Sequence, residues 1–326
     1  MVTPALKKQF TAMGTHVLST AEGTSIFARE FCGTTSDVEV SIGGVSFENS
    51  KTAEQDRDFF FTVPGTNSSL YQDHSINERA VVPMVAAGLW FNKAMTTVIK
   101  EAPLVQIQNL QVMKGLFLNA DTPLELNLEL TQKADVYYRG RLVDTSGALY
   151  YQCSAKGEKT MPELPESGQW SSDQDEFKYE LYGDTLFHGS HFQVLDTITS
   201  IGESGLDAVI QRPKSPTIED ASIENATAIL DGALQAALVW SRHLVGKKSL
   251  PTSIGKMVIG RLEGKGSINC RLFAKNHSKN KTVCDIYLHK DGIVLAYFED
   301  TTVHLLPTQV PKPTAEMSSN HLSEKV

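Results

Sequence analysis

The sequence has no excess of basic residues: 30 lysines and arginines stand against 38 aspartates and glutamates, a formal net charge of -8. Proteins that bind nucleic acid need a basic patch or stripe to meet the phosphates, so this composition argues against a nucleic-acid partner. No apolar run is long enough to span a bilayer, and residues 1–20 lack the continuous apolar core of a signal peptide. We therefore expect a cytoplasmic protein with no membrane partner.

Cysteine is also scarce, and its spacing does not match a metal site. We expect the cysteines to stay reduced and the protein to bind no metal. What remains is ordinary for a globular protein, with 41% hydrophobic and 21% charged residues in a chain of 326, enough for one large or two ordinary domains. The cysteines are Cys32, Cys153, Cys270 and Cys284.

A polar stretch with a single histidine precedes an apolar helical pattern. His74 is followed by Pro83, and residues 84–100 have apolar side chains at helical spacing. Proline is favoured at the start of a helix, where its missing N–H is not needed. The sequence therefore predicts that His74 lies on a turn ahead of a buried helix. A surface loop histidine is the simpler alternative.

A second helical pattern, at residues 225–245, is almost entirely apolar but contains an aspartate. Asp231 and Gln235 are four residues apart and therefore share one face of this helix. Because burying a carboxylate is costly, an aspartate in such a helix indicates function more than structure. The alternative is that Asp231 lies on a solvated stripe of the helix.

These stretches resemble the dehydratase domains of polyketide and polyunsaturated fatty acid synthases, most closely the bacterial polyunsaturated type. Residues 73–91 resemble its His-x3-Gly-x4-Pro motif, except that Glu78 takes the place of the glycine. Asp231 and Gln235 match the motif Asp-x3-Gln/His. Residues 181–193 resemble Gly-Tyr-x-Tyr-Gly-Pro-x-Phe, with Ser190 in place of the proline. The resemblance covers residues 45–305.

The pattern of elements agrees with the double hotdog fold, an α+β fold with two tandem copies of a long helix wrapped by an antiparallel sheet. Strand-like alternation surrounds the first helix and recurs around the second, and a proline-rich boundary separates the copies. We expect hotdogs at residues 43–165 and 176–306 and a disordered tail at 307–326. Residues 1–42 are either the end of a preceding ketoreductase domain or a simple N-terminal cap. The expected strands are 57–63, 104–110, 124–132, 135–144, 148–156, 194–201, 206–211, 256–262, 267–276, 282–289 and 293–305.

The resemblance implies removal of water from 3-hydroxyacyl thioesters, with His74 as base and Asp231 as acid. Burial is expected to raise the pKa of Asp231 so that it holds a proton near neutral pH. The substrate would arrive on the phosphopantetheine of an acyl carrier protein, with no other cofactor. Partners would be carrier domains and other domains of the same synthase, and a homodimer is compatible with this. Residues implied in substrate binding are Pro83, Tyr182, His188, Gly189, Phe192 and Gln235.

Two alternatives remain open. A non-catalytic domain could keep the fold for docking or chain-length control, and the departures at Glu78 and Ser190 favour it. A glutamate is strained where φ must be positive, whereas glycine is not. An enoyl isomerase could use the same His74 as base without any departing water. The sequence predicts backbone N–H groups at the start of the first helix, or near Gly189, as donors to the thioester oxygen.

Overall fold

The computed structural model describes residue 24 and residues 56–65, 70–100, 102–120, 122–134, 137–166, 177–213 and 222–306. The chain divides into two compact units, Met1–Ala53 and Glu54–Val326. Apart from Thr24, all described residues belong to the second unit. The predictions for residues 1–42 and 307–326 therefore lie outside the described residues. Within those residues, no helix is both long and apolar enough to cross a membrane.

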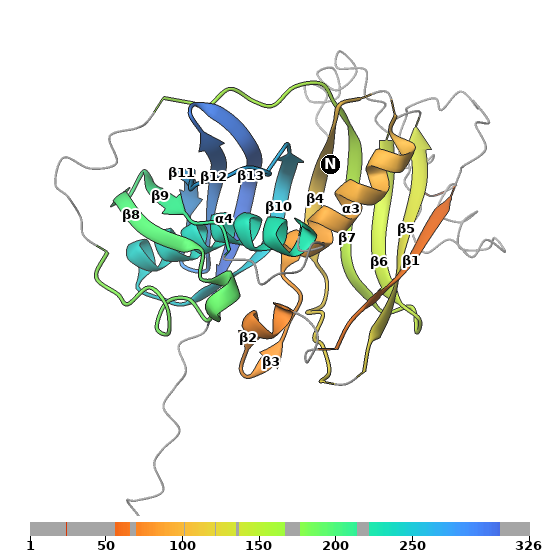
Figure 1. The fold of residues 1–326 in the computed structure, drawn as a ribbon, viewed down its shortest axis with the longest axis horizontal. Helices are drawn as coiled ribbons and strands as arrows, with labels where there is room; N and C mark the ends of the chain where they lie inside the picture. Colours follow the sequence, from red (N-terminus) through yellow and green to blue (C-terminus); the bar gives the residue numbers. More distant parts are fainter. Residues whose placement is uncertain are drawn as a thin grey trace, which may run out of the picture. The chain divides into compact units, whose positions relative to one another are not determined.

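The first half of this unit contains one long helix and five main strands, in the order that the sequence predicts (Figure 1). Leu126, Leu128 and Leu130 of one strand are all buried, which is the period-2 pattern of a strand with one face on the core. The elements are β1 (Arg57–Val63), η2 (Leu70–Asp73), β2 (Ser75–Ile76), β3 (Arg79–Ala80), α3 (Met84–Val98), β4 (Leu104–Val112), β5 (Leu124–Ala134), β6 (Tyr137–Asp144) and β7 (Leu149–Glu158).

The second half repeats the plan. Its helix, α4 (Ser222–Val245), is buried on nearly every side along its middle turns, and the indole N–H of Trp240 donates to the Gly202 carbonyl at 3.1 Å. The other elements are η3 (Ser190–Phe192), β8 (Leu195–Gly202), β9 (Gly205–Ile210), β10 (Ser249–Ile259), β11 (Ile268–His277), β12 (Lys281–Lys290) and β13 (Ile293–Leu305).

The largest boundary difference is at β10, which spans Ser249–Ile259, whereas the sequence predicted a strand at residues 256–262. The first residues of β10 include Pro251. Proline has no N–H to donate to a neighbouring strand, so its presence argues against a strand at this position. The structure accommodates it with a register shift between Pro251 and Ser253 opposite β13.

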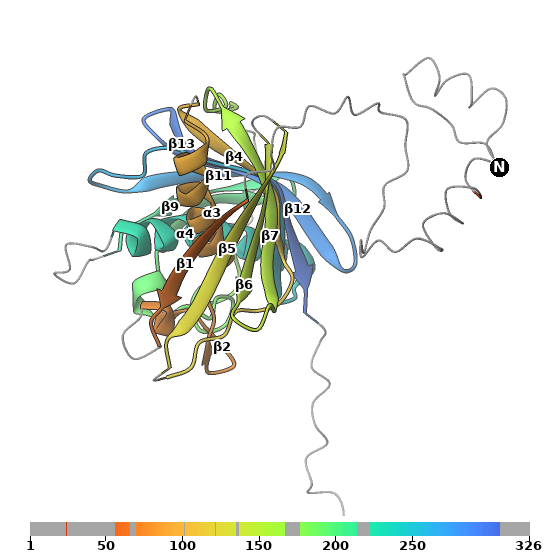
Figure 2. The same ribbon diagram turned by 90° about the vertical axis from the view of Figure 1, so that its right-hand side faces the viewer.

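The two halves share one antiparallel sheet. Its strand order is β1-β5-β6-β7-β4-β10-β13-β12-β11-β9-β8. The halves meet where β4 pairs with β10, with Ile107 opposite Met257 and Leu110 opposite Ile254. Helix α3 packs on β4 and β5, and α4 packs on β8–β13, so each helix is wrapped by its own half of the sheet (Figures 1 and 2). The predicted double hotdog is confirmed.

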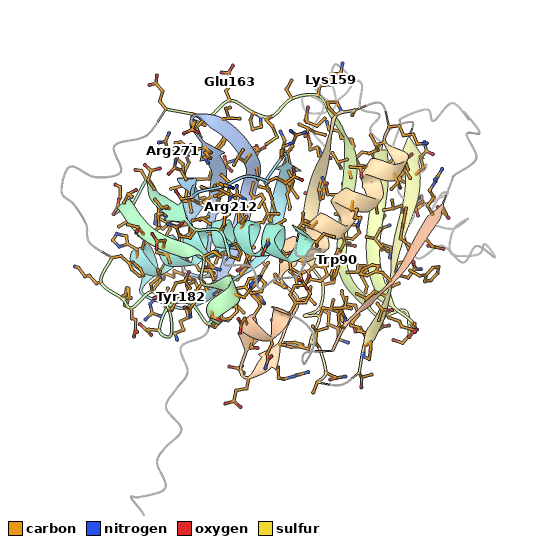
Figure 3. All side chains as sticks on the ribbon, in the orientation of Figure 1. Trp90, Lys159, Glu163, Tyr182, Arg212 and Arg271 are labelled. Carbon is orange, nitrogen blue, oxygen red and sulfur yellow. The ribbon has the colours of Figure 1, made fainter. Side chains whose placement is uncertain are left out.

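The segment between the halves is less exposed than its composition indicated. Its described part, residues 159–166, crosses above the second half of the sheet, as the positions of Lys159, Glu163 and Arg271 show in Figure 3. Met161 and Leu164 pack against Tyr287 and Tyr297. The Arg271 guanidinium donates to the Pro165 carbonyl at 3.0 Å. An aromatic pair on the outer face of the sheet thus packs against this proline-rich boundary segment.

Candidate active site

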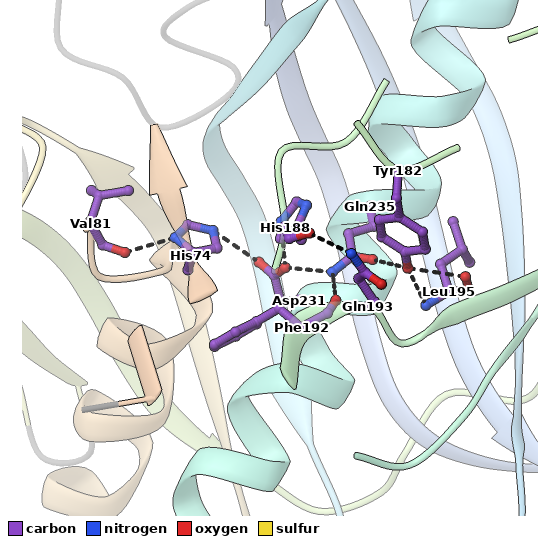
Figure 4. Close-up of polar contacts among 9 residues, drawn as sticks. All are labelled: His74, Val81, Tyr182, His188, Phe192, Gln193, Leu195, Asp231 and Gln235. Atoms are coloured by element: carbon purple, nitrogen blue, oxygen red, sulfur yellow. Dashed lines mark hydrogen bonds and ion pairs between the residues drawn. The ribbon is translucent and has the colours of Figure 1, made fainter. Parts of the chain in front are cut away.

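His74 lies on the turn between η2 and β2, and its side chain is buried. The ring is fixed from behind, because Nδ1 lies 2.7 Å from the carbonyl oxygen of Val81 (Figure 4). A carbonyl can only accept, so Nδ1 carries the hydrogen and donates it. In the neutral ring Nε2 is then unprotonated and can accept a proton.

Asp231 lies opposite this nitrogen, on the buried middle of α4, with 3% of its surface exposed. Its Oδ1 is 3.8 Å from His74 Nε2. The two side chains, one from each half, therefore face each other. The alternatives of a surface histidine and a solvated aspartate are both wrong, because the structure buries both residues.

Gln235 fixes the carboxylate one turn further along α4. Its side-chain N–H groups donate to Asp231 Oδ2 at 2.8 Å and to the Phe192 carbonyl at 2.8 Å. Its carbonyl oxygen lies 3.0 Å from the Tyr182 hydroxyl, which also accepts from the Leu195 N–H at 2.8 Å. Every polar atom of the Gln235 amide therefore has a partner, and its orientation follows from this network.

A second histidine contacts the carboxylate. His188 Nε2 is 3.0 Å from Asp231 Oδ2, and the ring is buried and stacks on Phe187 with centroids 4.2 Å apart. The sequence placed His188 among substrate-binding residues but gave no sign of this contact, which depends on how the segment before η3 folds over α4.

The pKa of Asp231 is shifted in the direction opposite to the prediction. Burial lowers the pKa of His74 to about 4, although the charge of Asp231 opposes this. Burial by itself raises the pKa of Asp231, but the charge of His188 and its hydrogen bond oppose burial, and His74 and Gln235 act in the same direction. The pKa of Asp231 therefore lies below its ordinary value. The predicted rise was wrong because sequence cannot show a histidine brought in from another segment.

The side chains of His74, His188 and Asp231 line a cavity of about 340 Å³ whose wall is otherwise mainly apolar. Residues from both halves contribute, including Leu250, Pro251 and Thr252 at the start of β10. A mainly apolar cavity with a few convergent polar groups is typical of a site for a small or chain-like ligand. The remaining lining residues are Ile76, Val81, Val82, Met84, Val112, Gly115, Phe117, Tyr151, Phe187, Leu234, Gln235 and Leu238.

Of the six residues implied in substrate binding, His188 and Gln235 line this cavity and four do not. Pro83 is the residue before the first turn of α3. Phe192 packs with its ring centroid 5.5 Å from that of His74, and Tyr182 holds Gln235. These residues position the lining groups from behind. Tyr151 and Phe117 line the cavity instead, and no motif in the sequence marked them.

Gly189 is the fourth implied substrate-binding residue that does not line the cavity, and its role is close packing between the two halves. Its N–H donates to the Asp73 carbonyl at 2.7 Å, and a Cβ at Gly189 would lie 2.6 Å from Asp73 Oδ1. The N–H predicted as a donor to the thioester oxygen is therefore already in use. Beside it, the Ser190 hydroxyl donates to Asp73 Oδ2 at 3.1 Å. The serine that replaces the family proline thus takes part in the contact between the two halves.

Glu78 does adopt the conformation that glycine favours. It has φ 63° and Asn77 has φ 50°, and together they form the two-residue turn between β2 and β3. Positive φ at both turn positions is the type I′ hairpin geometry, for which Asn-Gly is the preferred pair. The strain at Glu78 lies at the exposed tip of the hairpin, away from the carboxylate and the two histidines.

The donor atoms of His74, His188 and Asp231 lie within 4.8 Å of one another, close enough for a divalent cation, and no other such group occurs within the described residues. Three protein ligands are the number found in catalytic zinc sites. The sequence predicts no metal, and this stays a prediction.

Comparison with known proteins shows similarity to one group of synthase domains. Residues 158–313 match the family model described as "Polyketide synthase dehydratase N-terminal domain". Over 277 residues, the chain is 28% identical to a subunit of the polyunsaturated fatty acid synthase of Thraustochytrium sp. (strain ATCC 26185 / S-3). The chain is therefore similar to the polyketide synthase-type dehydratase domains. The match covers 79% of this chain but only 10% of the relative, so the chain corresponds to a small part of that protein.

Solved dehydratase domains share the fold. The CurJ dehydratase of curacin polyketide synthase superposes with a TM-score of 0.65 at 17% identity, covering 78% of this chain and 92% of that one. The CurF dehydratase of the same synthase has a TM-score of 0.63 at 17% identity and coverages of 79% and 96%. A trans-AT polyketide synthase dehydratase from Brevibacillus brevis has a TM-score of 0.61 at 18% identity, with coverages of 79% and 96%. At these identities the likeness shows the double hotdog fold.

Proposed function

We propose that this dehydratase domain removes water from 3-hydroxyacyl thioesters to give 2-enoyl thioesters. The observation that carries the proposal is the buried pair of His74 and Asp231, 3.8 Å apart on the wall of a mainly apolar cavity. The apolar wall suits an acyl chain, and the polar pair lies where the reacting carbons would be held. Two of the similar structures are described as inactive mutants of the CurK dehydratase, one with a histidine replaced by phenylalanine and one with an aspartate replaced by asparagine.

His74 is the base that takes the C2 proton. Its Nδ1–H donates to Val81 and leaves Nε2 unprotonated toward the cavity. Burial favours the neutral ring, which is the form that can accept a proton. The C2 electrons form the double bond as the C3–O bond breaks. The leaving hydroxyl needs a proton, and this comes from the Asp231 side of the cavity.

On this proposal, the thioester oxygen of the substrate binds at the start of α3. Met84, the first residue of α3, lines the cavity, and the N–H groups of a first helical turn lack partners within the helix. They can stabilise negative charge that develops on the oxygen as the C2 proton leaves. The other predicted donor, the Gly189 N–H, is bonded to Asp73 and is not available.

The proposed substrate is an acyl group on the phosphopantetheine of an acyl carrier protein, in polyunsaturated fatty acid or polyketide synthesis in the cytoplasm. The similarity to part of a polyunsaturated fatty acid synthase supports partners among the domains of the same synthase. On this proposal no further cofactor takes part.

The proposal is tested by mass spectrometry of the products from carrier-bound 3-hydroxyacyl substrates. The wild-type protein should release water, His74→Ala should abolish this, and Asp231→Asn should reduce it strongly, each by on the order of 10²–10⁴ in rate. His277→Ala and Asp291→Asn, both at exposed positions, are the matched controls and should retain full activity. Wild-type protein that is folded but no more active than His74→Ala and Asp231→Asn would instead indicate a docking domain.

The lowered pKa of Asp231 keeps the enoyl isomerase as a second candidate, since an ionised aspartate suits a reaction that needs a base but no leaving water. The same variants separate the two functions. With a 2-enoyl thioester as substrate, turnover that survives Asp231→Asn but not His74→Ala would favour isomerisation, and the product would then carry a shifted double bond.

A further inference from the structure

Asp231 has two polar partners on the same oxygen. His188 and Gln235 both contact Oδ2, at 3.0 Å and 2.8 Å, while Oδ1 faces His74. Both partners donate to the carboxylate and therefore favour its ionised form. An ionised carboxylate has no proton to give. The proton for the leaving hydroxyl must therefore be stored on a neighbour when the substrate arrives.

Among the described side chains that contact Asp231, one can store it. The Gln235 amide cannot give up a proton, and Tyr182 contacts Gln235 and Leu195 rather than the carboxylate. His74 must be neutral to take the C2 proton. His188 is buried, lines the same cavity and points Nε2 at Asp231. Within the described residues its Nδ1 has no hydrogen-bond partner, so Asp231 is the hydrogen-bonding contact of this ring, which also stacks on Phe187.

We propose that His188 and Asp231 act together as the acid, with the transferable proton held on His188 Nε2 before reaction. This deepens the proposed function and rests on it. As the C3–O bond breaks, its electron pair stays on oxygen and the proton passes from His188, through or alongside the Asp231 carboxylate, to form water. His74 becomes protonated with the C2 proton and His188 becomes neutral. The pair is restored when His74 loses a proton and His188 regains one.

The test compares two leaving groups. A 3-hydroxyacyl thioester needs a proton on its leaving group, whereas a 3-chloroacyl thioester loses chloride without one, and both need His74 as base. His188→Gln keeps an N–H donor for Asp231 but carries no transferable proton. We expect it to lower kcat for the hydroxy substrate by on the order of 10², with KM nearly unchanged, and to leave elimination of chloride close to wild type. His74→Ala should lose both reactions.

His191→Gln is the matched control, because His191 lies three residues away and the change keeps its backbone N–H, which donates to Asp73 Oδ2. It should behave as wild type with both substrates. His188→Gln that retains full dehydration would overturn the proposal, since hydrogen bonding alone would then suffice. An equal loss with both substrates would also overturn it and show a structural role. Wild-type protein that does not dehydrate the hydroxy substrate would instead defeat the proposed function itself.

Discussion

Asp73 and Ser190 join the two halves of the molecule directly beside the site. The Ser190 hydroxyl and the His191 N–H both donate to Asp73 Oδ2, at 3.1 Å and 2.8 Å. Asp73 precedes His74 in the chain, and Ser190 follows the His188-Gly189 pair. The contact therefore sets the spacing between the base on one half and the histidine that touches Asp231 on the other.

Replacing this carboxylate should reduce activity without removing any reacting group. Asp73→Ala leaves the His191 N–H unpaired and frees the two loops to separate. We expect a loss of about 1–3 kcal/mol in the free energy of unfolding and a fall in kcat of roughly 10²-fold per 1 Å of misplacement. Denaturant unfolding and steady-state kinetics check both, with Asp58→Ala on exposed β1 as control. Unchanged kcat in the Asp73 variant would show that the loops are held by other contacts.

Tyr182 should affect stability and kcat because it holds Gln235, which in turn holds Asp231. Tyr182→Phe removes the hydroxyl that contacts the Gln235 carbonyl and accepts the Leu195 N–H. Two buried groups then lack partners, and we expect a stability loss of about 1–3 kcal/mol. Because Gln235 holds Asp231, kcat should also fall while KM changes little. Tyr137→Phe at an exposed position is the control. A variant as stable and active as this control would mean that Gln235 keeps its orientation without the tyrosine.

Glu78→Gly should stabilise the protein. A non-glycine residue in the left-handed region costs roughly 1–2 kcal/mol, which exceeds the entropy that glycine adds to the unfolded chain, about 0.5–1 kcal/mol. The control is Glu203→Gly, at another exposed turn position but without positive φ, which should destabilise. Thermal unfolding of both variants measures the difference. Equal destabilisation by the two changes would show that the hairpin is not strained at Glu78. Activity should be unchanged or higher in Glu78→Gly.

Local patterns were enough to predict most of the individual helices and strands. Alternation at Leu126, Leu128 and Leu130 and the apolar run of α4 each depend on neighbours in the chain, so the sequence carries them directly. The pairing of β4 with β10 depends on residues far apart in the chain, and no local pattern predicts it. Pro251 hid the start of β10, because a proline in a strand is tolerated only where the register shifts.

The site could be predicted in part for the same reason. The spacing from His74 to Pro83 and from Asp231 to Gln235 is local, and both patterns marked residues that the structure brings to one cavity. The contact between His188 and Asp231 is tertiary, and it reverses the pKa shift that burial alone would give Asp231. Which neighbours oppose burial cannot be predicted from a helix pattern.

The last prediction concerns the pH dependence of the proposed dehydration. Burial disfavours the imidazolium and lowers the pKa of His74 to about 4, against an ordinary value of about 6.5. The ring accepts the C2 proton only when neutral, so activity is lost on acidification as the pH falls through this lowered pKa. We expect kcat/KM, which reports the free enzyme, to keep its full value from neutral pH to well below 6 and to show its acid limb near pH 4. Stopped assays in constant-ionic-strength buffers, with circular dichroism at each pH to confirm folding, measure this limb. NMR titration of the His74 ring protons, assigned by their absence in His74→Ala, gives the same quantity without turnover. An acid limb or ring titration near pH 6.5 in folded protein would mean that water reaches His74 and that burial does not keep the base neutral.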